Sequence, residues 1–249
     1  MPSSRSWYLD PVVAQQKGAI FLGWIRSATT GLTPRRILKT DVFEEANGED
    51  RILTQLFPEA ALSAGIDIQE FTVHQAARNT PGFAPLCADA RTLPFVDGAF
   101  DVIVSTSTLD HFDELADLRR SLRELARVVC PGGVLLVILD NPYNPLYHPL
   151  RWVTRRGWAP FQLGQTLTRR ELAAELEAAG LEIRSRDYLI HNPRLLSTAL
   201  YMVIRRLLGR YADGPIRLLL ACFNALGHLP TRGLTACFSA VAAAKPLAR

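Results

Sequence analysis

The stretch LCADARTLPFVDGAFDVIVSTSTLDHF, residues 86–112, carries more structural information than any other part of the chain. Its first apolar run is closed by an acidic residue, Asp89, and a Leu-Pro-Phe turn follows. A second apolar run, residues 101–105, leads through serines and threonines to Asp-His-Phe at 110–112. Pro-Gly-Gly at 131–133 then precedes a third apolar run, VLLVILD. Short runs of this kind, bounded by turn residues, predict buried strands of a parallel sheet.

The alternation of short apolar runs and amphipathic segments continues along the whole chain. Strands are predicted at residues 36–40, 61–68, 83–88, 101–105, 134–140, 181–190 and 234–244. Helices are predicted at residues 10–27, 50–57, 69–78, 113–129, 168–179, 193–209 and 215–227. Strands that alternate with helices predict an α/β fold. We expect a Rossmann-like, doubly wound, mostly parallel seven-stranded sheet with helices on both faces, an N-terminal helix and a C-terminal helical insertion before the last strand.

The composition is that of a folded protein, because 48% of the 249 residues are hydrophobic. The four cysteines lie far apart and form no Cys-x-x-Cys pair, which argues against a zinc site and a disulfide framework. No metal is therefore expected. Residues 1–10 are polar and no apolar run reaches about 18 residues, so we expect neither a signal peptide nor a membrane span. A cytoplasmic protein with reduced cysteines is predicted.

Positive charge is concentrated in the C-terminal part of the chain. From Pro193 onward there are eight basic residues and one acid, a net of +7, so residues 1–192 carry 4 − 7 = −3. Such a segment fits an anionic substrate, a membrane surface or nucleic acid, or only a solvated helix face. Because basic and aromatic residues do not interleave in one patch, no nucleic-acid partner is expected. Peripheral membrane contact through these basic helices stays open, and the oligomeric state is not predicted.

Residues 37–140 resemble the core of the class I S-adenosylmethionine-dependent methyltransferases, of the UbiE-like small-molecule type. The resemblance rests on the GID, CADA, LPF and FDVIVS segments and on Pro-Gly-Gly before VLLVILD. It implies S-adenosylmethionine as cofactor and methyl transfer as activity. The family's first motif, an acid and a Gly-x-Gly-x-Gly turn, is absent, because ILKTDVFEEANGED at 37–50 holds one glycine, Gly48. The same absence argues against a nicotinamide dehydrogenase, which wants G-x-G-x-x-G there.

The resemblance implies a set of cofactor contacts at the strand ends. Asp67, followed by Ile68, would accept both ribose hydroxyls, because two carboxylate oxygens match a vicinal diol. The alternative is that Asp67 caps the helix after it. Asp89 would accept from the adenine amino group, with the Ala90 amide facing the ring, or else it only forms a turn. Ser105 closes the next strand at the same edge.

The acidic loop after the first strand is expected to do the work of the missing glycine turn. Asp41 and Glu45 are candidates to hold the cofactor's ammonium group, and Lys39 or Thr40 to meet its carboxylate. The loop's single glycine, Gly48, is surrounded by carboxylates at positions 41, 44, 45, 49 and 50. The alternative is that this pocket binds nothing.

His111 is the residue best suited to acid–base chemistry. It follows the fourth strand, where the methyl donor's sulfonium would lie, so a neutral imidazole can take a proton from a hydroxyl or amine. Asp110 would orient it. The alternative is that His111 only lines the pocket, since methyl transfer often needs only positioning. Asn141 and Tyr143, beyond the fifth strand, are candidate substrate contacts, with a rigid proline-rich turn as the competing interpretation.

The two late helices are predicted to cover the acceptor. Their apolar stripes recur at helical spacing and exceed what one sheet face needs, so the surplus would line an apolar pocket. Ordinary core packing or a dimer contact is the alternative. We expect one domain, made of an N-terminal helical cap at 1–32, a cofactor-binding core at 33–192, the helical cover at 193–230 and a final strand at 231–249.

The activity expected from these features is methyl transfer to a small, largely apolar molecule, within small-molecule metabolism. The alternative is a methyltransferase-like fold that binds the cofactor or a partner without transferring methyl. A small-molecule substrate is the expected partner in the first case.

Overall fold

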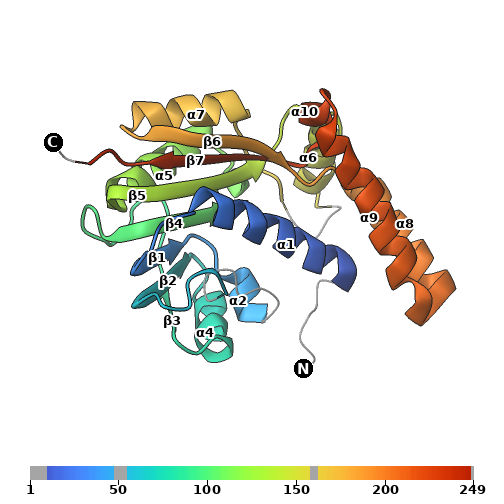
Figure 1. Cartoon of the computed structure of the whole chain (residues 1–249), viewed down its shortest axis with the longest axis horizontal. Coiled ribbons are helices and arrows are strands. Elements are labelled where there is room, and N and C mark those ends of the chain that lie inside the picture. Colours follow the sequence, from blue (N-terminus) through green and yellow to red (C-terminus); the bar gives the residue numbers. More distant parts are fainter. Residues whose placement is uncertain (1–9, 48–54, 158–161, 248–249) are drawn as a thin grey trace.

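The computed structural model describes residues 10–47, 55–157 and 162–247, and it confirms the predicted α/β architecture (Figure 1). Seven strands form one sheet in the order β3-β2-β1-β4-β5-β7-β6. Neighbouring strands are parallel from β3 to β5, whereas β7 is antiparallel to both of its neighbours. The strands span Arg36–Lys39 (β1), Leu62–Asp67 (β2), Phe83–Cys87 (β3), Phe100–Thr106 (β4), Val129–Asp140 (β5), Glu182–Leu189 (β6) and Phe238–Ala244 (β7).

Helices cover both faces of the sheet (Figure 1). Ile25 of α1 and Ala76 of α4 are buried in the core on one face. Leu122 of α5 and Leu172 of α7 are buried on the other. The α-helices span Pro11–Ala28 (α1), Phe43–Asn47 (α2), Glu70–Asn79 (α4), Leu115–Val128 (α5), Tyr147–Arg155 (α6), Arg169–Ala178 (α7), Arg194–Leu208 (α8), Asp213–Ala225 (α9) and Arg232–Thr235 (α10). Short 3-10 turns span Leu109–His111 (η1), Gly209–Tyr211 (η2) and Leu226–His228 (η3).

Helix α7 has a capping residue at each end. The Thr168 side chain accepts from the Glu171 backbone N–H at 3.2 Å, and the Glu171 carboxylate accepts from the Thr168 N–H at 2.9 Å. This reciprocal capping satisfies two N–H groups that the helix itself leaves unpaired. Gly180, just past the helix, has a φ of 85°, which a residue with a Cβ rarely adopts.

The prediction of a plain turn at Pro-Gly-Gly, residues 131–133, is wrong. This segment lies inside β5, which already pairs with β4 at Val129, bulges opposite Asp101 and resumes regular pairing at Val134. Gly132 has a φ of 79°, so glycine is what lets the strand bulge here. Its N–H donates to the carbonyl of Lys245 at 2.8 Å, which ties the bulge to the chain beyond β7.

Two further element predictions differ from the structure, and a third is largely untested. Residues 234–236 do not begin the last strand, because α10 and the turn after it occupy them, and β7 starts at Phe238. The helix α6 forms where only a proline-rich turn was expected, because Tyr147 and Leu150 bury against Leu163 in a small separate core. The helix predicted at 50–57 lies mostly outside the described residues.

Helices α8 and α9 form a hairpin that projects beyond the sheet (Figure 1). Its inner side packs on the first turn of α1, where Val12 joins Tyr201, Ile216 and Leu220 in a core of its own. The hairpin therefore depends on α1 for its burial. No helix among the described residues combines the length and apolarity needed to cross a bilayer.

Candidate cofactor site and active site

The carboxyl ends of four parallel strands meet at one edge of the sheet, which is where open α/β sheets bind ligands. Strands β3, β2, β1 and β4 are consecutive neighbours in the sheet. Asp67 is the last residue of β2, Ser105 lies at the end of β4, Thr40 directly follows β1 and Asp89 lies just past β3. The strand order therefore gathers these four predicted cofactor contacts at one edge.

Asp67 is fixed by a backbone turn and not by a helix cap. Its Oδ1 accepts from the backbone N–H of Gln69 at 2.8 Å. Gln69 itself is the N-cap of α4, so the alternative in which Asp67 caps this helix is wrong. The turn holds a half-buried carboxylate at the end of β2, and Ile68 beside it is 65% exposed. An acid next to an exposed apolar side chain suits a ribose and the base attached to it.

Asp89 is committed to a neighbouring arginine. The Arg91 guanidinium donates to the Asp89 carboxylate through Nε at 3.0 Å and Nη2 at 2.7 Å, and the Arg91 backbone N–H donates at 2.8 Å. These hydrogen bonds hold the pKa of Asp89 below its usual range, against partial burial. Arg91 also bonds Asp117 of α5 at 2.8 Å. The turn-forming alternative therefore explains Asp89 better than an adenine contact, and Ala90 packs in the adjoining core.

A cluster of hydroxyl groups joins β1 to β4 at the same edge. Thr40 Oγ1 lies 3.0 Å from Ser105 Oγ and 3.1 Å from Thr108 Oγ1. Ser107 between them has a φ of 52°, in the left-handed region that side chains rarely occupy. Its hydroxyl donates to Asp110 Oδ2 at 3.1 Å. Backbone strain of this kind gathers at functional sites, so the end of β4 is a candidate position for the chemistry.

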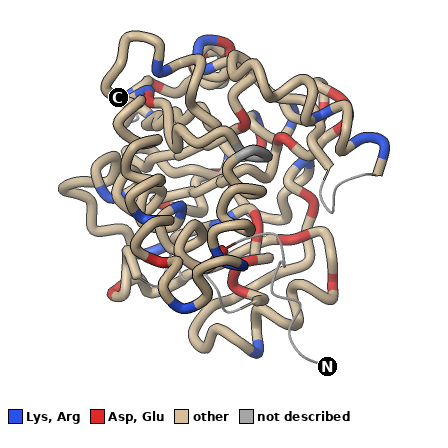
Figure 2. Tube along the Cα trace, turned by 90° about the vertical axis from the view of Figure 1, so that its right-hand side faces the viewer, with Lys and Arg blue, Asp and Glu red and all other residues tan. Residues whose placement is uncertain are grey.

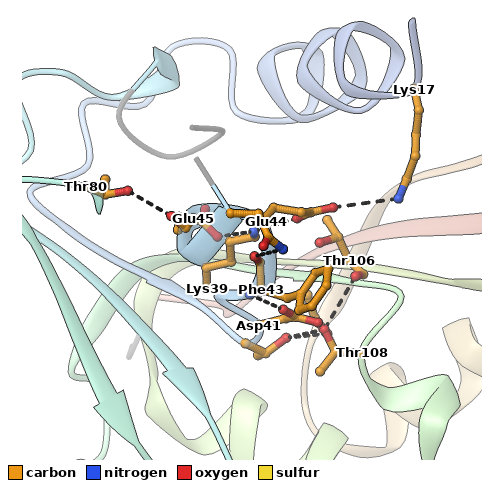
Figure 3. Close-up of polar contacts among 12 residues, drawn as sticks. Lys17, Lys39, Asp41, Phe43, Glu44, Glu45, Thr80, Thr106 and Thr108 are labelled. Atoms are coloured by element: carbon orange, nitrogen blue, oxygen red, sulfur yellow. Dashed lines mark hydrogen bonds and ion pairs between the residues drawn. The ribbon is translucent and has the colours of Figure 1, made fainter. Parts of the chain in front are cut away.

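A buried ionic cluster follows β1, where the family has its glycine turn (Figure 3). Lys39 is completely buried, and its Nζ lies 2.8 Å from Glu44 Oε2 and 2.7 Å from Glu45 Oε2, both on the short helix α2. Lys17 of α1 approaches Glu44 Oε1 at 3.7 Å. We call Lys17, Lys39, Asp41, Glu44 and Glu45 the β1 cluster. Its contacts between α1, β1 and α2 could not be foreseen from local sequence, although the excess of acids after β1 was visible there.

The β1 cluster has one negative charge more than its lysines balance when all its groups are ionised. Burial raises the pKa of Glu45 to about 7, against the attraction of Lys39. Burial also acts to raise the pKa of Glu44, but Lys39 and Lys17 outweigh it and lower that pKa to about 2. Burial raises the pKa of Asp41 as well, although Lys39 opposes it. Glu45 Oε1 is buried without a hydrogen-bond partner among the described residues. One further cationic donor would satisfy the cluster.

Lys39 and Thr40 were both predicted to contact the cofactor's carboxylate, but they are not equally accessible to a ligand. Lys39 already contacts two glutamates and has no exposed surface. Thr40 belongs to the hydroxyl cluster at the strand edge. Thr40 is therefore the better candidate, and Lys39 holds the glutamates in place. Gly48, the third predicted contact in this loop, lies outside the described residues.

His111 has the tautomer that a general base requires. Its Nδ1 lies 2.8 Å from the carbonyl oxygen of Gln162. Because a carbonyl can only accept, Nδ1 carries a proton, and in the neutral imidazole the lone pair is then on Nε2. The ring is exposed, so Nε2 is open to a substrate. Gln162 was not predicted, since nothing in the local sequence links it to a residue so far away along the chain.

Asp110 supports His111 through the backbone. Its carboxylate is buried and accepts from the Ser107 hydroxyl and, at 2.7 Å, from the backbone N–H of Asp140. These bonds lock the end of β4 to the end of β5 and fix the η1 turn that carries His111. The predicted task of orienting the imidazole nitrogen Nδ1 is performed by Gln162.

Asn141 and Tyr143 have different surroundings. Asn141 is fully buried, and its Nδ2 donates to the carbonyls of Gly233 at 2.7 Å and Ala236 at 3.0 Å. Its Oδ1 accepts from the Tyr143 N–H at 3.2 Å. These bonds favour the rigid-turn interpretation for Asn141, which holds α10 against the end of β5. Tyr143, 51% exposed, is the more accessible of the two predicted substrate contacts.

Comparison with known proteins points to one class of enzyme. Residues 45–137 match the family model described as a methyltransferase domain. A Mycobacterium ulcerans protein, phthiotriol/phenolphthiotriol dimycocerosates methyltransferase 1, is 29% identical over 76% of this chain and 67% of its own length. Malonyl-[acyl-carrier protein] O-methyltransferase of Geobacter sulfurreducens is 31% identical over 66% of this chain and 62% of its own. The chain thus spans about two thirds of each relative.

Two solved structures share the fold. Geranyl diphosphate methyltransferase, in complex with S-adenosylmethionine, has a TM-score of 0.60 at 12% identity, over 98% of this chain and 92% of its own. The [4+2]-cyclase SpnF has a TM-score of 0.56 at 20% identity, over 92% and 80%. Residues 45–137 thus resemble a methyltransferase domain, both relatives are named as methyltransferases, and the fold is shared with a solved S-adenosylmethionine complex.

Proposed function

We propose that this chain transfers the methyl group of S-adenosylmethionine to a small, largely apolar molecule. The β1 cluster is the observation that carries the proposal. Its carboxylates exceed its lysines by one charge, and Glu45 Oε1 has no partner among the described residues. The α-ammonium group of the cofactor supplies a cation with hydrogen-bond donors. Burying an unpaired carboxylate is costly, so a ligand that completes the pairing gains affinity from it.

The remaining cofactor contacts follow from the order of the strands. We assign the ribose to Asp67 with Ile68 beside it, and the cofactor's carboxylate to the hydroxyl of Thr40. Ser105 fixes Thr40 from β4. The cofactor then lies across the ends of β2, β1 and β4, as ligands of open α/β sheets do. Asp89 and Ala90 would border its adenine through the turn that Arg91 holds.

His111 is the proposed catalytic residue. When bound, S-adenosylmethionine supplies an electrophilic methyl group on its sulfonium. Nε2 of His111 accepts the proton that a hydroxyl or amine acceptor loses as its lone pair attacks that methyl. Gln162 keeps the ring in the competent tautomer, and Asp110 fixes the turn beneath it. An acceptor that loses no proton would need only the positioning that these groups give.

The class of acceptor is the finer part of the proposal. The names of the two relatives differ in their acceptor, dimycocerosates in one and a malonyl-[acyl-carrier protein] in the other. The class therefore rests on this chain's own residues, namely the leucine-rich hairpin of α8 and α9 at the C-terminal side and exposed Tyr143. We propose one domain in which this hairpin borders the acceptor, a cytoplasmic location, and peripheral membrane contact through the basic C-terminal helices.

Calorimetric titration with S-adenosylmethionine and with S-adenosylhomocysteine tests the cofactor assignment. Asp67→Ala removes a charge-assisted contact to the ribose, so we expect it to weaken binding by about 1.5–3 kcal/mol. Asp97→Ala is the matched control, because the Asp97 side chain is 80% exposed and precedes β4 at the opposite edge of the sheet. Wild-type affinity in Asp67→Ala would contradict the assignment.

A second candidate function is cofactor or partner binding without methyl transfer. The observation in its favour is the likeness in fold to SpnF, which is a [4+2]-cyclase. Incubation with methyl-labelled S-adenosylmethionine and a panel of apolar alcohols, phenols and amines separates the two functions. Label in an acceptor, lost in His111→Ala, supports transfer. Tight cofactor binding with no labelled product across the panel supports the second function.

A further inference from the structure

The α8–α9 hairpin buries only one side of each helix. Tyr201 and Ile216 pack inward against Val12 of α1. The outward sides carry large apolar residues that are more than a third exposed: Leu200, Met202, Val203, Leu207, Leu208, Tyr211 and Leu218. Single exposed leucines are ordinary, but a concentration of them on one projecting element marks an interaction site.

The most exposed apolar residues of the hairpin are concentrated where α8 ends and η2 begins. Leu207 is 76% exposed, Leu208 43% and Tyr211 69%. They are close in sequence and share one turn, so they lie together. This turn, which we call the hairpin tip, lies where the hairpin extends away from the body of the molecule (Figure 1).

Two arginines at the hairpin tip have no ion pair with any described acid. Arg206 and Arg210 are exposed, and the Arg210 guanidinium stacks on the Tyr211 ring at 4.8 Å. Arg205, by contrast, is paired with Asp10 at 2.9 Å and with Asp213 at 2.6 Å. Residues 193–228 hold five arginines and one aspartate, a net of 5 − 1 = +4.

We propose that the hairpin tip docks on the surface of an anionic lipid bilayer. Leu207, Leu208 and Tyr211 enter the boundary between headgroups and acyl chains, while Arg206 and Arg210 meet the anionic headgroups. Leucine and tyrosine beside arginine is the composition of segments that lie in this interface. The proposal stands on the hairpin alone and does not depend on the reaction at His111.

The charge of the hairpin favours contact with an anionic bilayer over contact with a second copy of the chain. Contact between two hairpin tips would place two segments of net +4 against each other, whereas an anionic surface attracts them. The whole chain carries +4, so the residues outside 193–228 sum to 4 − 4 = 0, and an anionic surface attracts the hairpin more than the rest of the molecule. Viewed from the side where the hairpin lies, Lys and Arg are interspersed with Asp and Glu (Figure 2). The positive excess is therefore a property of the hairpin and not of a broad face.

Vesicle flotation of the full chain tests the proposal. One set of vesicles holds phosphatidylglycerol and phosphatidylcholine, and the other holds phosphatidylcholine alone. We expect binding to the anionic set, weakened by salt, and about tenfold or more weaker in Arg206→Gln/Arg210→Gln, because each basic residue near such a surface adds severalfold. Leu207→Gln/Tyr211→Gln should lose binding to a similar extent. Circular dichroism checks that both variants are folded.

Matched controls replace equally exposed residues elsewhere. Val96→Gln alters an apolar side chain that is 77% exposed, and Arg123→Gln/Arg184→Gln removes two exposed charges from α5 and β6. Both controls should bind as the wild type does. The proposal is overturned if the wild type does not bind anionic vesicles, or if the tip variants bind equally well. Light scattering that shows dimers lost in Leu207→Gln, with no vesicle binding, would instead assign this surface to contact between copies.

Discussion

The β1 cluster and the hairpin tip place charged and apolar side chains in opposite environments. After β1, a lysine and a glutamate are almost completely buried in one ionic contact. On the hairpin, leucines and a tyrosine are exposed beside Arg206 and Arg210, which form no ion pair with an acid in the described part of the chain. Each arrangement runs against the ordinary preference for burying apolar groups and exposing charges. We propose different partners for the two regions, a small cation for the β1 cluster and an anionic lipid surface for the hairpin tip.

Removing the lysine of the β1 cluster should have the largest effect. Lys39→Met leaves Glu44 and Glu45 without their shared cation, and breaking a buried pair from one side costs about 3–5 kcal/mol. The free energy of unfolding in urea measures this loss. Lys17→Met is the matched control, because Lys17 is 35% exposed and its pair should contribute less than about 1 kcal/mol. Equal losses in both variants would show that Lys39 is not the centre of the cluster.

The inner side of the hairpin should be nearly as sensitive as the cluster. Ile216 is completely buried against α1 and α8, so Ile216→Ala removes apolar contacts and leaves a cavity, at about 2–4 kcal/mol. Leu218→Ala, two positions further along α9, is the control, because that side chain is 68% exposed. Thermal unfolding monitored by circular dichroism compares the two. A hairpin that folds independently of α1 would instead melt in a separate transition.

The acidity of Glu45 should make stability and cofactor affinity depend on pH in opposite directions. Its folded pKa, about 7, lies above its ordinary 4.5, so its contribution to stability is present below pH 4.5 and is lost as the pH rises through 7. The ammonium of the cofactor requires the ionised carboxylate, so affinity should rise about tenfold from pH 6 to pH 8. Urea unfolding and calorimetry over this range measure the two trends. Glu45→Gln should flatten both, and parallel trends would contradict the role given to Glu45.

The outer side of the hairpin should have the smallest effect on stability. Leu207→Gln changes a side chain that is 76% exposed, so the free energy of unfolding should stay within about 0.5 kcal/mol of the wild type. Chemical denaturation measures it, with Ile216→Ala as the sensitive reference. A loss above about 2 kcal/mol would mean that Leu207 is packed in solution, and the hairpin tip would then be no docking surface.

Most strands of the sheet could be predicted from the sequence, but few of the side-chain contacts at its carboxyl edge could. Apolar runs ending in Asp67, Ser105 and Asp140 have the length of buried strands. Asp67 and Asp140 do close β2 and β5, and Ser105 lies one residue before the end of β4. The bulge at Gly132 was missed because a Pro-Gly-Gly turn and a bulge look alike in one dimension. Helix α6 was missed because prolines in its approach suggested a turn, while its stability comes from burial against Leu163.

A site residue could be predicted from the sequence only where one side chain at a strand end is enough for the proposed contact with the cofactor. Asp67 is such a case. The contact of Glu44 with Lys17 of α1 and that of His111 with Gln162 join residues far apart in the sequence, so no local pattern predicts them. Asp89 and Asn141 were predicted to contact ligands, but both have structural roles. Asp89 accepts hydrogen bonds from Arg91, and Asn141 donates to a carbonyl of α10. The residue spacing in the sequence does not predict these hydrogen bonds.

Comparing two ligands in one calorimetric experiment tests the central claim, that the β1 cluster holds the amino-acid end of the cofactor. S-adenosylhomocysteine carries the ammonium and carboxylate, whereas 5′-methylthioadenosine keeps the adenosine and sulfur but lacks that end. Glu45→Gln should weaken S-adenosylhomocysteine by about tenfold or more while leaving 5′-methylthioadenosine unchanged, because only the first ligand offers a cation to Glu45. Glu59→Gln, at an exposed position, should alter neither. Equal affinities of Glu45→Gln and wild type for S-adenosylhomocysteine would contradict the claim.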